Sequence, residues 1–174
     1  MILGMSTAAF TLFHVILSLI GIAAGFVAVA GMLTARQLPG WTGLFLATTV
    51  ATSVTGFFFH SASFGAPHVV GVISLVVFAA TLPALYVYRL AGSWRWIYVV
   101  GAIVSLYLNT FVGVVQAFQK IPLLHQFAPL GTEPPFAIAQ GIVLVAFIGI
   151  GIRAVKKFHP LQPAPATSAQ ATSR

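Results

Sequence analysis

Five long apolar segments, separated by short connections, set the strongest limit on how this chain can fold. They lie near residues 8–33, 41–60, 67–89, 95–118 and 135–155. Each has about the 20 residues that an α-helix needs to cross about 30 Å of hydrocarbon. Of the 174 residues, 59% are hydrophobic and only 5% are charged, which leaves too little polar surface for a soluble domain. We therefore expect an all-α integral membrane bundle of five transmembrane helices.

The two ends of the chain lead to different expectations. The opening residues MILGMSTAAF carry no basic side chain and continue directly into the first apolar segment, so they do not resemble a secretory signal. Residues 160–174 are rich in proline, alanine, serine and threonine, and they contain too little apolar surface to fold. We expect one membrane domain at 1–159, with its first helix retained, and a disordered cytoplasmic tail after it.

The distribution of lysine and arginine predicts the orientation in the membrane. Cations in short loops are retained on the cytoplasmic side. With five spans, one side of the membrane receives Lys120 alone. The other side receives seven cations, namely Arg36, Arg89, Arg95, Arg153, Lys156, Lys157 and Arg174. The N-terminus is therefore predicted to lie outside and the C-terminus in the cytoplasm.

The formal net charge of +7 also bears on the partners of the chain. Because the cations flank apolar spans, we expect membrane lipids with anionic headgroups as partners, and no nucleic acid. In hydropathy and loop length the chain resembles small multi-pass proteins of the bacterial inner membrane. We expect it in that membrane.

Small and polar residues share one face in each of the first two segments. The two series are His14, Ser18, Gly21 and Gly25, and Thr49, Ser53, Gly56 and His60. Steps of three and four residues place side chains on the same side of a helix. The stretch GIAAG is a small-xxx-small pattern, which predicts close helix packing. The hydroxyls of the second segment either act as packing contacts or line a solute path.

Most of the uncommon polar side chains fall in the outer half of the predicted bundle. His14 lies about 9 Å below the outer edge, at about 1.5 Å per residue. Polar groups inside a membrane are costly unless they are paired or hydrated, so they indicate a functional site. The candidate ligand-binding residues are His14, His60, His68, Asn109, Gln116 and Gln140. Among the histidines we expect His14 to matter most, with the amide of Asn109 or Gln140 as its partner.

Three kinds of chemistry fit these residues. In the first, His14, His60 and His68 bind zinc or copper, or supply axial ligands to haem iron. A tight outer turn through Gly65 and Pro67 would hold His60 and His68 close together. In the second, imidazole or amide groups donate hydrogen bonds to a quinone. In the third, titrating histidines form a proton-linked path for a solute or lipid.

Each of these readings competes with a purely structural one. His60 and His68 at the interface can bond water, and the buried groups can hydrogen-bond one another. Catalysis has little support, because Glu133 is the single acid, cysteine is absent and no hydrolase nucleophile motif occurs. We therefore do not expect an enzyme. The alternatives to a ligand site are an accessory or assembly subunit that partners another membrane subunit or its own copy, and a small solute or lipid transporter.

Overall fold

The structure is a computed structural model that describes residues 2, 4–59 and 65–159. These residues form six helices and no strand, which confirms the all-α fold class. The helices are α1 (Thr7–Leu33), α2 (Pro39–Gly56), α3 (Ala66–Tyr86), α4 (Trp94–Lys120), α5 (Pro122–His125) and α6 (Pro134–Lys157). Each of the five apolar segments contains one long helix. The connection at 60–64 and the tail predicted at 160–174 lie outside the described residues.

The helix ends follow from the local sequence. Ser6 caps α1, because its Oγ accepts the Ala9 N–H at 3.2 Å. At the other end Ala35 has a φ of 56°, and the Arg36 N–H donates to the Gly31 carbonyl at 2.9 Å, as in a Schellman ending. Proline occupies the first turn of α2, α3, α5 and α6, where a helix does not need the missing N–H. The prolines therefore mark the starts of these four helices.

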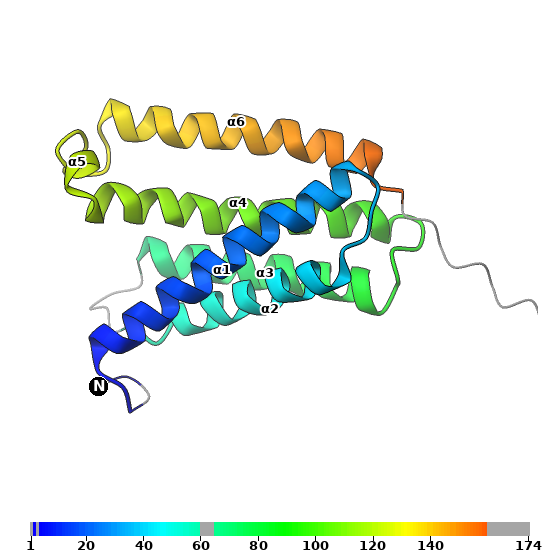
Figure 1. Cartoon of the computed structure of the whole chain (residues 1–174), viewed down its shortest axis with the longest axis horizontal. Coiled ribbons are helices and arrows are strands. Elements are labelled where there is room, and N and C mark those ends of the chain that lie inside the picture. Colours follow the sequence, from blue (N-terminus) through cyan, green and yellow to red (C-terminus); the bar gives the residue numbers. More distant parts are fainter. Residues whose placement is uncertain (1, 3, 60–64, 160–174) are drawn as a thin grey trace, which may run out of the picture.

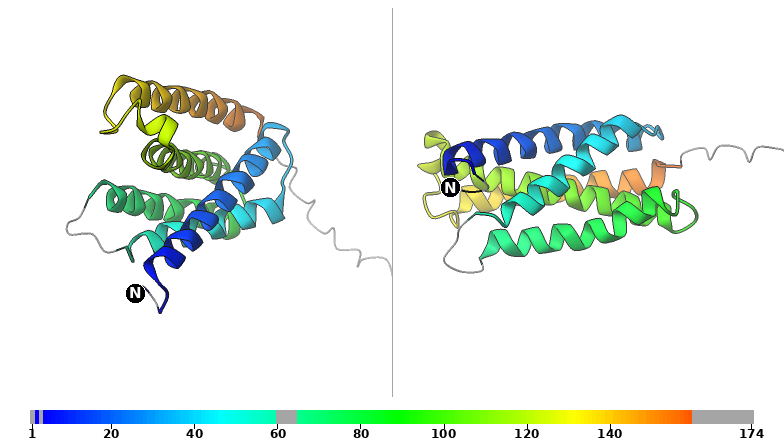
Figure 2. Two further views of the ribbon diagram at one scale, coloured as in Figure 1. Left: turned by 60° about the vertical axis from the view of Figure 1, so that its left-hand side comes forward. Right: turned by 90° about the horizontal axis from the view of Figure 1, so that it is seen from below.

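Helices α1 to α4 form a four-helix ring, and α6 lies outside it. In the ring α1 packs on α2, α2 on α3, α3 on α4, and α4 on α1. Helix α6 packs mainly on α4 and runs antiparallel to it (Figure 1). Two further views show the same order, with α4 between α3 and α6 (Figure 2). Helix α4 thus makes the main contact between α6 and the ring, and α1 makes a smaller one.

The outer surface of the bundle is strongly apolar. Large hydrophobic side chains face outward on several helices, among them Leu12, Val76, Ile142 and Val145. Among the described residues, four helices are long and apolar enough to cross a membrane, namely α1, α3 from Pro67 to Tyr86, α4 and α6. Helix α2 falls outside this group, since its 18 residues include five threonines and a serine. The chain therefore has the character of a membrane protein, with four candidate spans.

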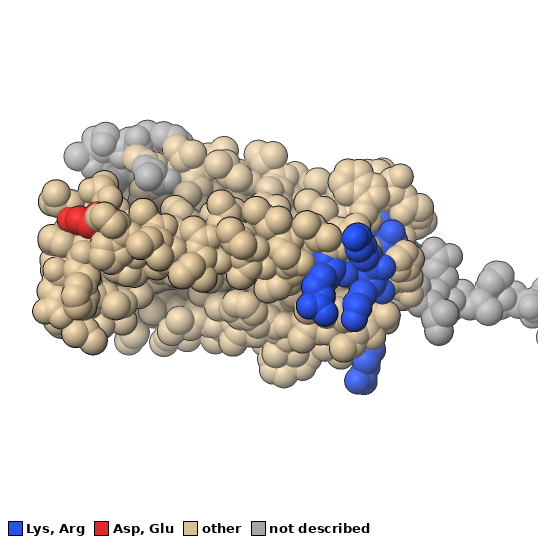
Figure 3. All heavy atoms as spheres, turned by 90° about the horizontal axis from the view of Figure 1, so that it is seen from above, with Lys and Arg blue, Asp and Glu red and all other residues tan. Residues whose placement is uncertain are grey.

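Charged side chains gather at the two ends of the bundle. We call the end at which α1, α3 and α6 finish the basic end. Figure 3 shows its lysines and arginines in blue, with Glu133 in red at the opposite end. The described cations of the basic end are Arg36, Arg89, Arg95, Arg153, Lys156 and Lys157. Lys120 finishes α4 at the other end.

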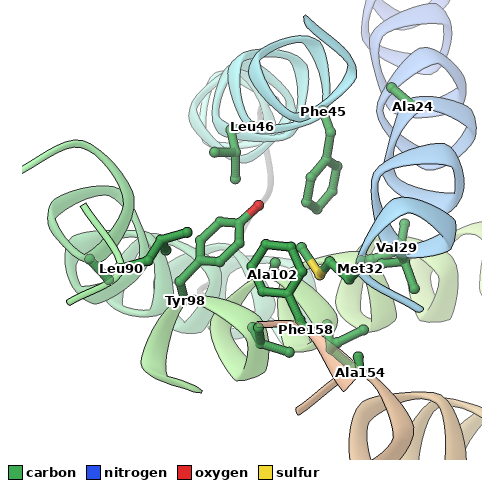
Figure 4. Close-up of a cluster of buried hydrophobic side chains, with 14 of the residues drawn as sticks. Ala24, Val29, Met32, Phe45, Leu46, Leu90, Tyr98, Ala102, Ala154 and Phe158 are labelled. Atoms are coloured by element: carbon green, nitrogen blue, oxygen red, sulfur yellow. The ribbon is translucent and has the colours of Figure 1, made fainter. Parts of the chain in front are cut away.

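Apolar side chains fill the half of the bundle next to the basic end. Tyr98, Phe45 and Met32 point into this core from α4, α2 and α1 (Figure 4). Phe158, which directly follows α6, is 2% exposed and packs into the same core. These contacts hold the helices together at the basic end.

Candidate functional site

A cavity lined by both polar and apolar side chains lies in the four-helix ring, in the half away from the basic end. Its volume is about 100 Å³. All four helices of the ring contribute to its walls. The polar lining residues are His14 from α1, Thr49, Thr52 and Ser53 from α2, His68 and Ser74 from α3, and Asn109 from α4.

A hydroxyl of α2 holds the imidazole of His14. The Nδ1 atom of His14 lies 2.9 Å from Thr55 Oγ1. Thr55 donates its single hydroxyl proton to the Ala51 carbonyl, at 2.7 Å. The Thr55 oxygen must then accept, so the proton between the two side chains belongs to His14 Nδ1. Neutral His14 therefore has an unprotonated Nε2, for which the described residues supply no hydrogen-bond donor.

Two of the lining residues, Thr49 and Asn109, also pack against Gly21 of α1. A methyl group at Gly21 would lie 3.0 Å from Thr49 Oγ1 and 3.1 Å from Asn109 Nδ2. Thr49 is only 3% exposed and Asn109 only 9%. Within the described part of the chain, Thr49 Oγ1, Thr52 Oγ1 and Asn109 Nδ2 have no hydrogen-bond partner. Buried polar atoms are rarely left unpaired, so Thr49, Thr52 and Asn109 are the lining residues that stand out as candidates to bind water or a ligand group.

His68 stands at the outer end of the cavity, in the first turn of α3. Its Nδ1 accepts the Gly65 N–H at 3.2 Å, which helps to begin the helix. This bond places the proton of neutral His68 on Nε2. Phe57 lies beside it, with ring centroids 5.9 Å apart, and the Phe57 ring also covers Gly71. The two histidines thus carry their protons on different ring nitrogens.

The structure brings part of the predicted set together. His14, His68 and Asn109, predicted from three different segments, line one cavity. The partner of His14 is Thr55, and neither Asn109 nor Gln140 bonds it. The reason is that α1 packs directly on α2, which places a threonine beside the imidazole. His60 lies outside the described residues.

The two glutamines of the predicted set lie away from this cavity. Gln140 is buried where α6 packs on α4, and its Nε2 donates to the Phe111 carbonyl at 3.1 Å. Because α6 lies outside the ring, this amide does not reach the interior of the ring. Gln116 is exposed on α4, close to the end of that helix.

Sequence reasoning missed Thr52, Thr55 and Ser74. Thr48, Thr52 and Thr55 are spaced by four and three residues, so they form a second hydroxyl face on α2 beside the predicted one. The abundance of threonine in α2 was the available signal. Ser74 had no comparable signal, because it is a single hydroxyl in an otherwise apolar stretch of α3.

The size and ligands of the cavity limit what it can hold. The described residues contain no group of three or more His, Cys, Asp or Glu side chains that could hold a metal ion. A drug-sized ligand needs about 300 Å³ or more, so a porphyrin exceeds this cavity. Several waters or one small oxygen-bearing headgroup match the volume of about 100 Å³.

The cavity and the apolar helices are the two features of the described chain that bear most on its function. The main observation is that Thr49, Thr52 and Asn109 each have a buried polar atom with no partner among the described residues. Comparison with known proteins found no family model, no curated protein and no solved structure that matches this chain.

Proposed function

We propose that this chain is a five-span protein of the bacterial inner membrane that binds the oxygen-bearing headgroup of a membrane-soluble molecule. Among the groups that the sequence suggests, a quinone headgroup fits best. The observation that carries the proposal is that Thr49, Thr52 and Asn109 line one cavity and that each has a buried side-chain N or O atom with no partner among the described residues.

The arrangement of α2 supports five spans. Its 18 residues extend about 27 Å at about 1.5 Å per residue, close to the thickness of a hydrocarbon core. It packs on both α1 and α3, and its hydroxyls turn toward its own carbonyls or the cavity. Hydroxyls that bond carbonyls of their own helix or face the interior of the bundle allow a helix to cross lipid despite a modest hydropathy. The cations of the basic end support a cytoplasmic C-terminus.

The chemistry of Thr49 and Asn109 supports a ligand with an oxygen acceptor. The Asn109 amide has two N–H donors, and Thr49 has one O–H donor. A ligand carbonyl oxygen that came within reach of either group would accept a hydrogen bond from it. A buried donor without a partner destabilises the folded protein by roughly 1 to 3 kcal/mol. A ligand that accepts a hydrogen bond from such a donor would recover that free energy on binding.

Two competing functions fit the geometry less well. A metal site would need a third ligand beyond His14 and His68, and His60, the third histidine predicted for it, lies outside the described residues. A path for a solute across the whole membrane would have to continue through the other half of the ring. Phe45, Leu46 and Leu106 are each 2% exposed or less there and fill that half.

Ligand binding can be tested on the full chain purified in mild detergent. The probe is a benzoquinone with a decyl tail, titrated by calorimetry. Thr49→Val and Asn109→Leu should each weaken binding by about tenfold, since each removes a hydrogen bond to a buried carbonyl. Thr110→Val is the matched control. It also removes a buried hydroxyl that has no partner in the described chain, but Thr110 does not line the cavity.

The outcome separates the proposal from its rivals. Equal loss of affinity in Thr49→Val and Thr110→Val would mean that the quinone binds elsewhere. No binding to the wild type would overturn the proposal. In that case, a second membrane protein that co-purifies with the chain would favour the accessory-subunit role.

A further inference from the structure

Four cations gather around the C-terminal end of α6, at the basic end of the bundle. Arg153, Lys156 and Lys157 lie on its last two turns, and steps of three and four residues place them on one side of the helix. Arg95 joins them from α4, because its Nη1 donates to two carbonyls at the end of α6. Figure 3 shows the lysines and arginines in blue gathered at this end. We call Arg95, Arg153, Lys156 and Lys157 the α6 cation cluster.

The chain supplies no acidic side chain to balance this cluster. Glu133 is the single Asp or Glu among the 174 residues. It lies at the opposite end of α6, about 35 Å away at about 1.5 Å per residue. The C-terminal dipole of α6 offers only about half a negative charge against four positive ones. Most of this positive charge therefore has to be balanced by anions from outside the chain.

Apolar side chains adjoin the cluster on the outward side of α6. Ile148, Ile152 and Lys156 follow one another at steps of four residues, so one side of the helix passes from apolar to cationic. Ile148 and Ile152 are each 53% exposed. Helix α6 is long and apolar enough to cross a membrane, which would put these two side chains against acyl chains and the cations among headgroups.

From these contacts and charges we infer that the α6 cation cluster is a binding site for one anionic phospholipid. Its phosphate lies among the cations, and an acyl chain lies along Ile148 and Ile152. A negative headgroup on an apolar tail matches both surfaces, whereas a soluble phosphate matches the cations alone. The site lies at the other end of the bundle from the cavity, so it does not depend on the proposed function.

Such a site differs from the general attraction between a basic surface and anionic lipid. The general attraction depends on how many cations lie near the bilayer. A binding site depends on which cations are present. Arg89 offers a comparison, because it is an exposed cation in the connection after α3, whereas α6 packs on α4 and α1.

The test measures lipid binding to the full chain in mild detergent by native mass spectrometry. The probes are dioleoyl phosphatidylglycerol, which is anionic, and dioleoyl phosphatidylcholine, which is zwitterionic. The wild type should bind the anionic lipid about tenfold more tightly or better. Each cation near a lipid phosphate contributes about fivefold in affinity, so Arg153→Gln/Lys157→Gln should weaken phosphatidylglycerol binding about 25-fold. Glycerol phosphate, which has no acyl chain, should not displace the lipid at equal concentration.

The matched control is Arg89→Gln/Lys120→Gln, which removes the same charge from positions outside the cluster. All four substituted positions are exposed, so both double variants should fold like the wild type. The control should keep the affinity of the wild type for phosphatidylglycerol. Arg153→Lys retains the cation and should keep it as well.

Three results would overturn the inference. Equal losses in the two double variants would mean that lipid binding follows net charge. Equal affinities of the wild type for the two lipids would mean that the cluster does not select an anion. Displacement of the lipid by glycerol phosphate at equal concentration would mean that the cluster binds a soluble anion.

Discussion

Single glycines determine how closely α1 approaches its neighbours in the ring. A methyl group at Gly25 would lie 2.6 Å from a Leu106 methyl and 2.9 Å from the Phe45 ring. One turn away, Gly21 faces hydroxyl and amide groups. The packing role predicted for the GIAAG stretch is therefore confirmed. Gly25 therefore lies at the apolar core, and Gly21 lies next to polar side chains, two of which line the cavity.

Replacing Gly21 with alanine should disturb the cavity and lower stability. The new methyl group would lie 3.0 to 3.1 Å from three polar atoms, of Thr49, Asn109 and Thr48. Overpacking of this kind costs about 1 to 3 kcal/mol. We expect Gly21→Ala to lower the unfolding free energy by that amount in detergent, and to weaken binding of the quinone probe.

The control for this variant is Gly149→Ala, in the middle of α6. A methyl group there meets no other atom within 4 Å. Alanine favours a helix over glycine by about 1 kcal/mol, so this variant should be neutral or more stable. If Gly21→Ala is as stable as Gly149→Ala, the close approach at Gly21 does not govern the packing of the ring.

At the scale of the elements, the two ends of α6 are held in different ways. At its C-terminal end Arg95, from the first turn of α4, donates through Nη1 to the carbonyls of Val155 and Phe158 at 2.9 and 2.7 Å. The last carbonyls of a helix have no partner within it, and a cation there also opposes the helix dipole. Arg95 therefore attaches α6 to α4 as well as capping it.

Arg95→Met should destabilise the protein through the loss of these two bonds. A hydrogen bond to a charged group contributes about 1.5 to 3 kcal/mol, so we expect a loss of about 2 kcal/mol in the unfolding free energy. Denaturant unfolding in detergent measures it. Arg153→Met, which removes an exposed cation from the same end, should change stability by less than about 0.5 kcal/mol. Equal losses in the two variants would contradict the capping role.

The N-terminal end of α6 depends on Glu133. Its two carboxylate oxygens accept the N–H groups of Leu130 and Thr132, each at 2.9 Å. The bond from Leu130 is the main cause that lowers the Glu133 pKa below its ordinary value of 4.5. A lowered pKa means that the carboxylate stabilises the fold above the ordinary value, and that this contribution is lost as pH falls through the folded-state pKa.

Glu133→Gln should therefore change the pH dependence of stability. The wild type should have the higher melting temperature at neutral pH. The difference should disappear in acid, once the wild-type carboxyl is protonated as well. Melting temperatures measured in detergent from neutral pH to below pH 4.5 will show this. A difference that stays constant over that range would mean that the carboxylate charge has no part in holding the turn.

At the scale of the whole molecule, the bundle is divided into two halves. The half at the basic end is an apolar core, and the other half contains the cavity with His14, His68 and Asn109. In the proposed orientation the cavity lies toward the outside of the cell. A ligand would then enter from the outer leaflet, on the side away from the cations.

Reporter fusions test the proposed topology. A reporter after His159 should be active only in the cytoplasm, and one inserted after Phe127 only outside. An N-terminal reporter decides the number of spans. On the side opposite the C-terminal reporter it indicates five crossings, and on the same side it indicates four, with α2 not crossing. The reverse of the first two results would place the cavity toward the cytoplasm.

The sequence alone was sufficient for the helical class, the long apolar segments and the distribution of cations. These depend on hydropathy and on the chain order of charges, which are local properties. It also identified Gly21 and Gly25 as packing residues, because a glycine in an apolar helix has few other uses. Residues 160–174 and His60, where sequence also led to predictions, lie outside the described part of the chain.

Only the tertiary structure decided which polar groups meet. His14 bonds Thr55, and Asn109 reaches the same cavity, whereas Gln140 bonds a carbonyl of α4 and Gln116 is exposed. The distance of a residue from the end of its helix can be counted from the sequence, and by this count Asn109 and Gln140 are predicted to lie at similar depths in the membrane. The direction in which each side chain points depends on how its helix is rotated and which neighbour it packs on. That rotation follows from contacts between helices distant in the chain, such as those at Gly21 and Gly25, which no single segment encodes.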